Sequence, residues 1–240
     1  MTEQPTTTAP TRVMALYAHP DDPEFFSGGT LIKWADEGKE IIYVLATSGD
    51  KGSDDPEMTS DRLVQIRQTE QRAAARHAKS DNVIFLGFRD GELVPDLGLR
   101  RALTRVIRQQ KPDIIVTNDP TTRWNTAGSI NHPDHRAIGD ATLDAVFPAA
   151  RDRLNFIELW RDESLDPHKV KQVYLAGTLS PNAKVDISGV LDRKIAAICE
   201  HKSQVKDVDG LIKRLRDNPD SELRGDRPAY TESFRVLTLR

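Results

Sequence analysis

This sequence of 240 residues has one cysteine, no long apolar run and no excess of positive charge. The single cysteine, Cys199, excludes an internal disulfide and favours a reducing, cytoplasmic location. No apolar run approaches the roughly 20 residues that a membrane span requires. The formal net charge of -3 gives no electrostatic reason to expect binding to nucleic acid or to an anionic membrane. We therefore expect a soluble protein with neither of these partners.

The first residues also lack a targeting signal. Residues 1–11 are polar and rich in Thr and Pro, with neither the basic stretch nor the apolar stretch of a signal peptide. We expect a disordered tail there. The remaining residues, 12–240, contain no internal repeat and no Gly/Ser linker, and their number suits one α/β domain with a sizeable core. A single domain over 12–240 is the simplest prediction.

Strand-like and helix-like segments alternate through the first two thirds of the chain. Unbroken apolar runs of strand length cover residues 13–17, 41–46, 83–86 and 114–117. Each run is followed by a helical pattern, at 27–37, 59–77, 97–110 and 137–146. This alternation predicts parallel strands with right-handed crossovers, and unbroken apolar runs are typical of strands buried on both faces. We expect an α/β, Rossmann-like fold: a mostly parallel twisted sheet flanked by helices on both faces.

The pattern becomes less regular toward the C-terminus. A long polar loop over 118–130 carries Trp124 and Asn125, and loops of this length commonly act as lids or binding loops. Beyond Pro148 the strand-like segments are 170–175 and 234–239, and the helical ones are 187–204 and a basic amphipathic stretch at 206–215. We interpret that last stretch as a solvated helix face, and we expect a less regular C-terminal third.

The first polar motif, residues 18–24 (Ala-His-Pro-Asp-Asp-Pro-Glu), directly follows the first predicted strand. In open α/β sheets, ligands bind where the loops leave the C-terminal ends of the strands. The imidazole of His19 and the carboxylates of Asp21 and Asp22 therefore fall at the expected ligand-binding edge. Imidazole and carboxylate suit a hydrolytic zinc ion, and a second carboxylate can act as a base toward a metal-bound water.

A second motif, residues 131–136 (Asn-His-Pro-Asp-His-Arg), supplies two more histidines and a carboxylate at the start of a helical pattern. Any one of these histidines alone is compatible with an ordinary helix-capping or packing residue. Two histidines beside Asp134, together with the first motif, favour a metal site instead.

The glycines after the first strand invite a different interpretation, a dinucleotide-binding protein. Such a protein requires a G-x-G-x-x-G fingerprint after the first strand and an acid at the end of the second. The chain has His-Pro-Asp-Asp at the first place and Thr47-Ser48-Gly49 at the second. We therefore reject nucleotide binding and expect Gly28 and Gly29 to serve close helix packing.

The two histidine motifs together resemble the LmbE-like (PIG-L) family of zinc-dependent N-deacetylases. The similarity extends through nearly the whole chain and includes Gly28-Gly29-Thr30, Thr47-Ser48-Gly49, Arg67 with Glu70, Arg89-Asp90-Gly91 and His201-Lys202-Ser203-Gln204. One departure concerns Pro23, which stands before Glu24 where the family often has Glu directly after the second Asp. We expect this departure to alter hydrogen bonds of the loop without removing a ligand.

The resemblance implies a role for each residue of the two motifs. His19, Asp22 and His135 would ligate the metal, and Asp21 would be the general base. Three N/O ligands leave one position of a tetrahedral zinc ion open for water. His132 would assist as a cationic or acidic group near the oxyanion and the leaving amine.

Three further roles have ordinary alternatives. Asp134 would hydrogen-bond His132 and keep it protonated, or it is simply a carboxylate favoured at a helix N-terminus. Arg67 would contact sugar hydroxyls of the substrate, or it forms an i,i+3 ion pair with Glu70 on a helix surface. Asp90 would also contact the sugar, or it only stabilises a turn.

The function implied by the resemblance is that of a metal-dependent amidohydrolase acting on linear amides. It would remove the acetyl group from an N-acetylated amino sugar or a related conjugate through a metal-activated water. The expected cofactor is Zn²⁺, with Fe²⁺ as the alternative, and the expected assembly is a homo-oligomer, a trimer or a hexamer. Two alternatives remain open, hydrolysis of another small-molecule amide and a non-catalytic metal-binding protein.

Overall fold

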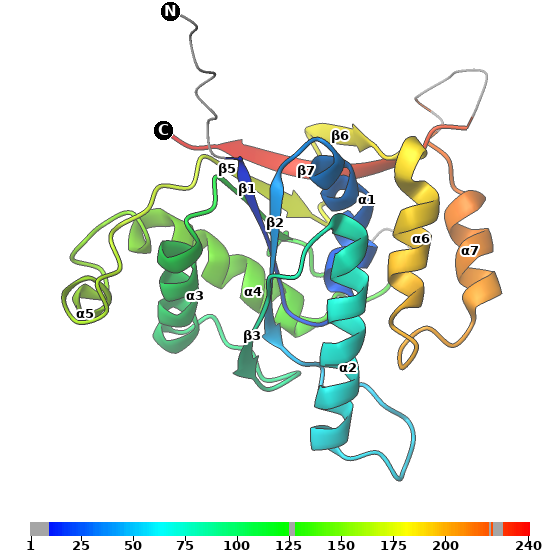
Figure 1. Ribbon diagram of the computed structural model, residues 1–240, viewed down its shortest axis with the longest axis horizontal. Helices are drawn as coiled ribbons and strands as arrows, with labels where there is room; N and C mark the ends of the chain where they lie inside the picture. The colour runs from blue at the N-terminus through cyan, green and yellow to red at the C-terminus, as the bar shows by residue number, and fades with distance from the viewer. Residues whose placement is uncertain (1–9, 125–127, 221, 223–227) are drawn as a thin grey trace, which may run out of the picture.

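The computed structural model of the chain describes residues 10–124, 128–220, 222 and 228–240. Residues 1–9 of the predicted tail, and Asn125 of the long loop, lie outside this range. The strands are β1 (Arg12–Tyr17), β2 (Glu40–Thr47), β3 (Val83–Phe88), β4 (Ile114–Asn118), β5 (Gln172–Ala176), β6 (Ala183–Asp186) and β7 (Thr231–Thr238) (Figure 1). The α-helices are α1 (Asp22–Asp36), α2 (Ser60–Ala75), α3 (Leu97–Gln110), α4 (Pro133–Asp144), α5 (Ile157–Arg161), α6 (Leu191–Cys199) and α7 (Val208–Arg216).

The seven described strands form one mixed sheet in the order β3-β2-β1-β4-β5-β7-β6. The first five strands are parallel to one another, whereas β7 runs antiparallel to both β5 and β6. The predicted Rossmann-like, mostly parallel sheet is therefore confirmed. β6 was not predicted, because a four-residue edge strand with no fully buried side chain leaves no apolar pattern in the sequence.

Helices cover both faces of the sheet, as the buried strands require. Met14 and Leu16 of β1 share one apolar cluster with α3 and α4. Val13 and Ala15 of the same strand share the other cluster with α1 and the end of α2. Alternate residues of one strand thus enter two separate cores, which explains why the strand is apolar without interruption.

The order of strands places a topological switch point at β1. The chain leaves β1 toward β2 on one side, whereas β4 pairs with β1 on the other side. Loops that leave neighbouring strands in opposite directions separate at such a switch point and leave room for a ligand. The His19 motif follows β1 and the His132 motif follows β4, so the topology brings the two motifs together.

Three helices differ clearly from their predicted limits, and one of them, α4, begins at Pro133 rather than at residue 137. α1 begins at Asp22, well before the predicted start at Ser27, with Pro23 in its first turn. Proline is well tolerated there, because the first N–H groups of a helix have no partner within the helix. The predicted helix over 187–204 contains a 3₁₀ turn followed by α6, which ends at Cys199. Among the described helices, none is both long and apolar enough to cross a bilayer.

The glycine pair of α1 marks a close contact with the C-terminal part of the chain. A Cβ atom on Gly29 would lie 2.7 Å from Ile187, whereas a Cβ on Gly28 would meet nothing nearer than 3.6 Å. The backbone N–H groups of Gly29 and Thr30 donate to the buried carboxylate of Glu232 in β7, at 2.9 and 2.7 Å. The predicted role of the glycines in close packing is confirmed for Gly29.

These distances predict opposite effects of two neighbouring substitutions. We expect Gly29→Ala to destabilise the protein by about 1–3 kcal/mol, because the new methyl group overlaps Ile187. Gly28→Ala is the matched control, and it should be neutral or stabilise the helix by up to about 1 kcal/mol. Urea unfolding of the two variants measures the difference. Equal stabilities would contradict the packing described here.

Candidate metal centre

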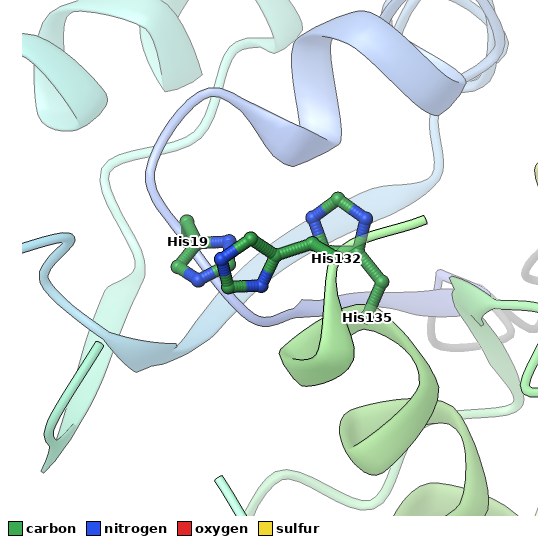
Figure 2. A group of neighbouring side chains, drawn as sticks. All are labelled: His19, His132 and His135. Carbon is green, nitrogen blue, oxygen red and sulfur yellow. The ribbon is translucent and has the colours of Figure 1, made fainter. Parts of the chain in front are cut away.

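Two loops and one helix bring the candidate residues together at the C-terminal edge of the sheet. His19 lies in the loop after β1, and His132 and His135 lie at the start of α4. Figure 2 shows the three histidine side chains gathered close together. The ring centroids of His19 and His132 are 4.6 Å apart, and those of His19 and His135 are 5.3 Å apart. The two sequence motifs therefore form one site.

The carboxylate of Asp22 bridges two of these histidines. Its Oδ2 lies 3.2 Å from Nδ1 of His19, and its Oδ1 lies 3.0 Å from Nε2 of His135. Ligand atoms about 2.0–2.1 Å from a tetrahedral zinc ion lie about 3.3 Å from one another. Two pairs within the predicted ligand set, each through a different oxygen of Asp22, therefore lie at about the spacing found in a zinc site.

The remaining ring nitrogens are held by other acceptors. Nε2 of His19 lies 3.0 Å from Asp90 and 3.2 Å from Asp134. Nδ1 of His135 lies 2.9 Å from the side-chain oxygen of Asn131. When Nε2 of His19 and Nδ1 of His135 donate these hydrogen bonds, the other ring nitrogens carry a free electron pair. These are Nδ1 of His19 and Nε2 of His135, and both lie beside Asp22. This is the usual arrangement around metal-ligating histidines.

The electrostatics of the site favour a cation. Burial opposes the charged form of His19, yet Asp22 and two further carboxylates raise the pKa of its imidazole to about 12. The pKa of Asp22 is far below its usual value, because the two imidazoles outweigh the effect of its burial. Without a metal, a proton occupies the place between His19 and Asp22, and a divalent ion would displace it.

The structure also contains two groupings that the sequence did not predict as ligand sets. Within each, the possible ligand atoms lie within 4.8 Å of one another. The first is His19 with His132 and His135, and the second is His19 with Asp90 and Asp134. Asp22 belongs to neither, although it contacts both His19 and His135. A metal between the three histidines is compatible with the predicted set, since the two share His19 and His135.

Asp21, the predicted base, has an unusual backbone conformation. Its φ angle is 90°, in the left-handed region that residues other than glycine rarely adopt. Its N–H donates to Oε1 of Gln71 at 3.0 Å, and its carboxylate lies 3.4 Å from the guanidinium of Arg67. Burial raises the pKa of Asp21 to about 6, against the opposing charge of Arg67. Strain of this kind often accompanies a functional residue.

The two predicted substrate-binding residues mainly contact the protein itself. Arg67 is 4% exposed, and its guanidinium donates to the carbonyl oxygens of Pro20 and Gly49 at 2.6 and 3.1 Å. The alternative ion pair with Glu70 is wrong, because Glu70 instead accepts hydrogen bonds from Ser203. That pair could not be excluded from sequence spacing alone.

Asp90 is likewise buried and lies against His19, while its second oxygen accepts from the backbone N–H of Lys51 at 3.3 Å. The predicted contacts of Arg67 and Asp90 with a sugar stay predictions. The structure adds that both residues help to hold the loops around the candidate site.

The predicted partner of Asp134 requires a correction. Its carboxylate contacts His19, and it accepts the backbone N–H groups of Gly91 and Leu93 at 2.7 and 3.2 Å. His132 instead accepts the backbone N–H of Asp134 through Nδ1 at 3.2 Å. Because α4 begins at Pro133, the Asp134 side chain points across the site rather than back toward the preceding ring. Its part in catalysis stays a prediction.

A buried polar network behind Asp21 could not be inferred from the sequence. Nε2 of Gln71 donates to Oε1 of Glu24 at 2.9 Å, and Oε2 of Glu24 lies 3.1 Å from Nε2 of His201. The side chains of these residues are almost fully buried. His201 belongs to a family-like motif, but sequence spacing assigns it no partner. The Pro23 departure thus leaves Glu24 pointing inward, onto Gln71 and His201.

A cavity of about 370 Å³ opens beside the histidines. It is lined by Phe26, Asn118, Asp119, Thr122, Ser129, Ile130, Asn131, His132, His135, Ala176 and Gly177. Its volume is near the lower end of the range for small-molecule sites, about 300–1,000 Å³. His132 and His135 of the candidate site therefore border a space that a small molecule can enter.

Comparisons with known proteins agree with this geometry. A family model described as GlcNAc-PI de-N-acetylase (PIG-L) matches residues 14–146. The chain is 33% identical over 193 residues to the diacetylchitobiose deacetylase of Thermococcus kodakarensis, covering 80% of this chain and 70% of that protein.

Two further comparisons extend over more of the chain. Identity is 30% over 245 residues to a 1D-myo-inositol 2-acetamido-2-deoxy-alpha-D-glucopyranoside deacetylase of Saccharopolyspora erythraea, covering 82% of this chain and 85% of that protein. The solved structure of N,N'-diacetylchitobiose deacetylase from Pyrococcus horikoshii matches with a TM-score of 0.82 at 28% identity, over 95% of this chain and 84% of that chain. Each of these relatives is named as a deacetylase of an N-acetylated amino sugar.

The geometry predicts that metal binding stabilises the fold. A ligand that binds only the folded state at a hundred times its Kd stabilises it by about 2.7 kcal/mol. For a chain of this size that corresponds to a rise in Tm of roughly 5–10 °C. We expect this rise when Zn²⁺ is added to chelator-treated protein, and differential scanning calorimetry measures it.

Asp22→Ala should abolish the rise in Tm on addition of Zn²⁺, because it removes the carboxylate that bridges His19 and His135. Asp186→Ala, which removes a carboxylate at the exposed end of β6, is the control and should keep the response. A wild-type Tm that does not change with Zn²⁺ would contradict the metal site.

Proposed function

Because this chain belongs to the PIG-L (LmbE-like) family, we propose that it is a metal-dependent hydrolase that removes the acetyl group from an N-acetylated amino sugar or its conjugate. The observation that carries the proposal is that His19 and His135 each direct one ring nitrogen to the carboxylate of Asp22. The other ring nitrogen of each histidine contacts a hydrogen-bond acceptor. A site of this kind offers two imidazoles and one carboxylate to a metal ion. Hydrolysis of another small-molecule amide remains the alternative within the same chemistry.

His19, Asp22 and His135 would hold the metal ion, which we propose to be Zn²⁺, with Fe²⁺ as the alternative. This ligand set of imidazoles and a carboxylate is common to hydrolytic zinc sites. A bound Zn²⁺ would supply an acidified water molecule and polarise the amide carbonyl. The contacts of His19 with Asp90 and Asp134 would fix its ring in the orientation that binding requires.

Asp21 is proposed to take the proton from the attacking water. It neighbours Asp22 in sequence and is not needed as a ligand, and its carboxylate is close enough to Asp22 and His19 to feel their charges. Burial raises its pKa to about 6, which brings its basicity close to the range suited to a general base near neutral pH. Gln71 and Arg67 hold its backbone and its carboxylate.

His132 is proposed to stabilise the oxyanion as a neutral hydrogen-bond donor. Nδ1 of His132 accepts the N–H of Asp134, which assigns the ring proton to Nε2. Burial and the neighbouring His19 lower the pKa of His132, so the neutral ring is favoured at neutral pH. This neutral ring differs from the cationic or acidic group that the family resemblance implies, although the proposed hydrogen bond to the oxyanion is the same. The proton that Asp21 takes from water would pass to the leaving amine.

Three expectations about the whole protein remain proposals. We propose that residues 12–240 form one domain and that the protein acts in the cytoplasm. We also propose a homo-oligomer, a trimer or a hexamer, on the basis of the family resemblance. Gel filtration with light scattering measures the last of these.

Asp21→Asn tests the proposed base. The amide keeps the size of the side chain but cannot accept the proton of water, so we expect kcat to fall about 10²- to 10⁴-fold. The metal content should stay at the wild-type value, because Asp21 is not a proposed ligand. Amine release from N,N'-diacetylchitobiose and metal analysis of the same preparation provide the two readouts. Near-wild-type turnover would refute the assignment.

Gln71→Leu tests how the base is positioned. The variant removes the acceptor of the Asp21 N–H, and we expect kcat to fall roughly tenfold, since one hydrogen bond contributes about 0.5–1.5 kcal/mol. The metal content should be unchanged. Gln68→Leu is the matched control on the same helix: its side chain donates to Ser48, not to Asp21, so turnover should be retained. Equal effects of the two variants would argue against a positioning role.

A further inference from the structure

The segment that follows α6 packs behind the proposed base. α6 lies against α1 and α2 (Figure 1), and residues 201–204 come directly after its end. The hydroxyl and the N–H of Ser203 donate to the carboxylate of Glu70 in α2, at 2.6 and 2.7 Å. Nε2 of Gln204 donates to the carbonyl oxygen of Gly52, in the loop after β2, at 3.0 Å. These contacts fix the segment beside Gln71, the sequence neighbour of Glu70.

His201 begins this segment, and its ring is fully buried. Nε2 of the ring lies 3.1 Å from Oε2 of Glu24 in α1. Because a carboxylate oxygen accepts hydrogen bonds, the ring donates through Nε2. Nδ1 of the ring has no hydrogen-bond partner among the described residues. The contact with Glu24 is therefore the hydrogen bond that these residues provide to the ring.

The carboxylate of Glu24 decides how the amide group of Gln71 is turned. Oε1 of Glu24 accepts from Nε2 of Gln71 at 2.9 Å, so the NH2 group faces Glu24. The amide oxygen then faces Asp21 and accepts its backbone N–H at 3.0 Å. If the amide were reversed, two N–H donors would meet at Asp21 and two oxygens would meet at Glu24. The contact with Glu24 thus selects the orientation that Asp21 requires.

The last residue in this chain of contacts is Asp21, whose φ angle is 90°. A residue with a side chain persists in such a conformation only where the surrounding structure fixes it. The hydrogen bond from its N–H to Gln71 is one of the contacts that do so. The position of the Asp21 carboxylate follows from its backbone. A change in the orientation of Gln71 would therefore move the carboxylate relative to Asp22.

From this geometry we infer that His201 and Glu24 are positioning residues for the base Asp21. His201 orients Glu24, which in turn orients the amide of Gln71. The amide then holds the backbone of Asp21 through its oxygen. The inference rests on the proposed deacetylase function, and it extends the machinery of the site to the C-terminal third of the chain. It assigns His201 no contact with the metal or the substrate.

Two substitutions of His201 that differ by one methylene group test this role. The side-chain nitrogen of Gln reaches about the place of Nε2, whereas that of Asn reaches only the place of Nδ1. We expect His201→Asn to lower kcat for amine release from N,N'-diacetylchitobiose about 3- to 10-fold, the effect of one hydrogen bond. KM should stay within twofold and the metal content unchanged. His201→Gln keeps a donor to Glu24 and should regain most of the lost kcat.

Two further variants guard against effects on folding. His201→Phe also lacks the donor but fills the space of the ring, so it should show the same fall in kcat even if the smaller side chain of Asn disrupts folding. Lys194→Met is the matched control for a lost buried contact. It removes the ion pair with Glu232, which lies outside the chain of contacts from His201 to Asp21. Its Tm should fall, while kcat stays within twofold of wild type.

A double-mutant cycle separates positioning from a general loss of stability. In Gln71→Leu the chain of contacts is already broken, so adding His201→Asn should lower kcat no further. Falls of equal size in the wild-type and Gln71→Leu backgrounds would overturn the positioning role, because His201 would then act without Gln71.

The outcomes separate this inference from the proposed function. No amine release by zinc-loaded wild-type protein overturns the proposed function, and the inference with it. An active wild type whose kcat is unchanged in His201→Asn and His201→Phe overturns the inference alone. A fall in kcat that His201→Gln reverses, and that disappears in the Gln71→Leu background, supports both.

Discussion

The buried carboxylate of Asp22 is the contact on which the rest of the site depends. An ionised carboxylate in the interior is costly unless it is paired and hydrogen-bonded. Asp22 accepts the backbone N–H of His19 at 2.8 Å and contacts the rings of His19 and His135. It thereby joins the loop after β1 to the start of α4, two segments that are far apart in the sequence. A cation bound beside Asp22 would compensate the negative charge of this carboxylate, which burial shields from water and from dissolved ions.

Buried polar groups also hold α1 in place behind the site. Glu232 of β7 accepts two backbone N–H groups of α1 and forms an ion pair with Lys194 at 2.6 Å. Near the start of the same helix, Glu24 contacts Gln71 and His201. Residues of α2, β7 and the segment after α6 therefore hold the N-terminal part of α1, from Glu24 to Thr30, directly after Asp21 and Asp22.

Much of the fold could be predicted because its strands are buried on both faces. The apolar runs of β1, β2 and β4 are continuous, and runs of this length and composition are typical of strands covered by helices on both sides. β6 could not be predicted, because its four residues lie at an edge and bury no side chain fully. The start of α1 at Asp22 was also missed, since a proline in the first turn and two glycines weaken a helical pattern in sequence alone.

The site was predictable only in part, for a related reason. Sequence motifs identify which residues carry the chemistry, and the topology of the sheet brings His19 and His135 together. The partner of a side chain depends on packing between distant elements, which spacing does not encode. Asp134 therefore proved to contact His19 rather than His132, and Arg67 to contact the loop backbone rather than Glu70.

The central claim is that a metal ion binds between His19, Asp22 and His135. Crystals of the zinc-loaded protein, measured at the zinc absorption edge, test it most directly. The account predicts one anomalous peak within about 2.0–2.2 Å of Nδ1 of His19, a carboxylate oxygen of Asp22 and Nε2 of His135. A peak at the Nε2 side of His19, between Asp90 and Asp134, or no peak at all, would contradict it.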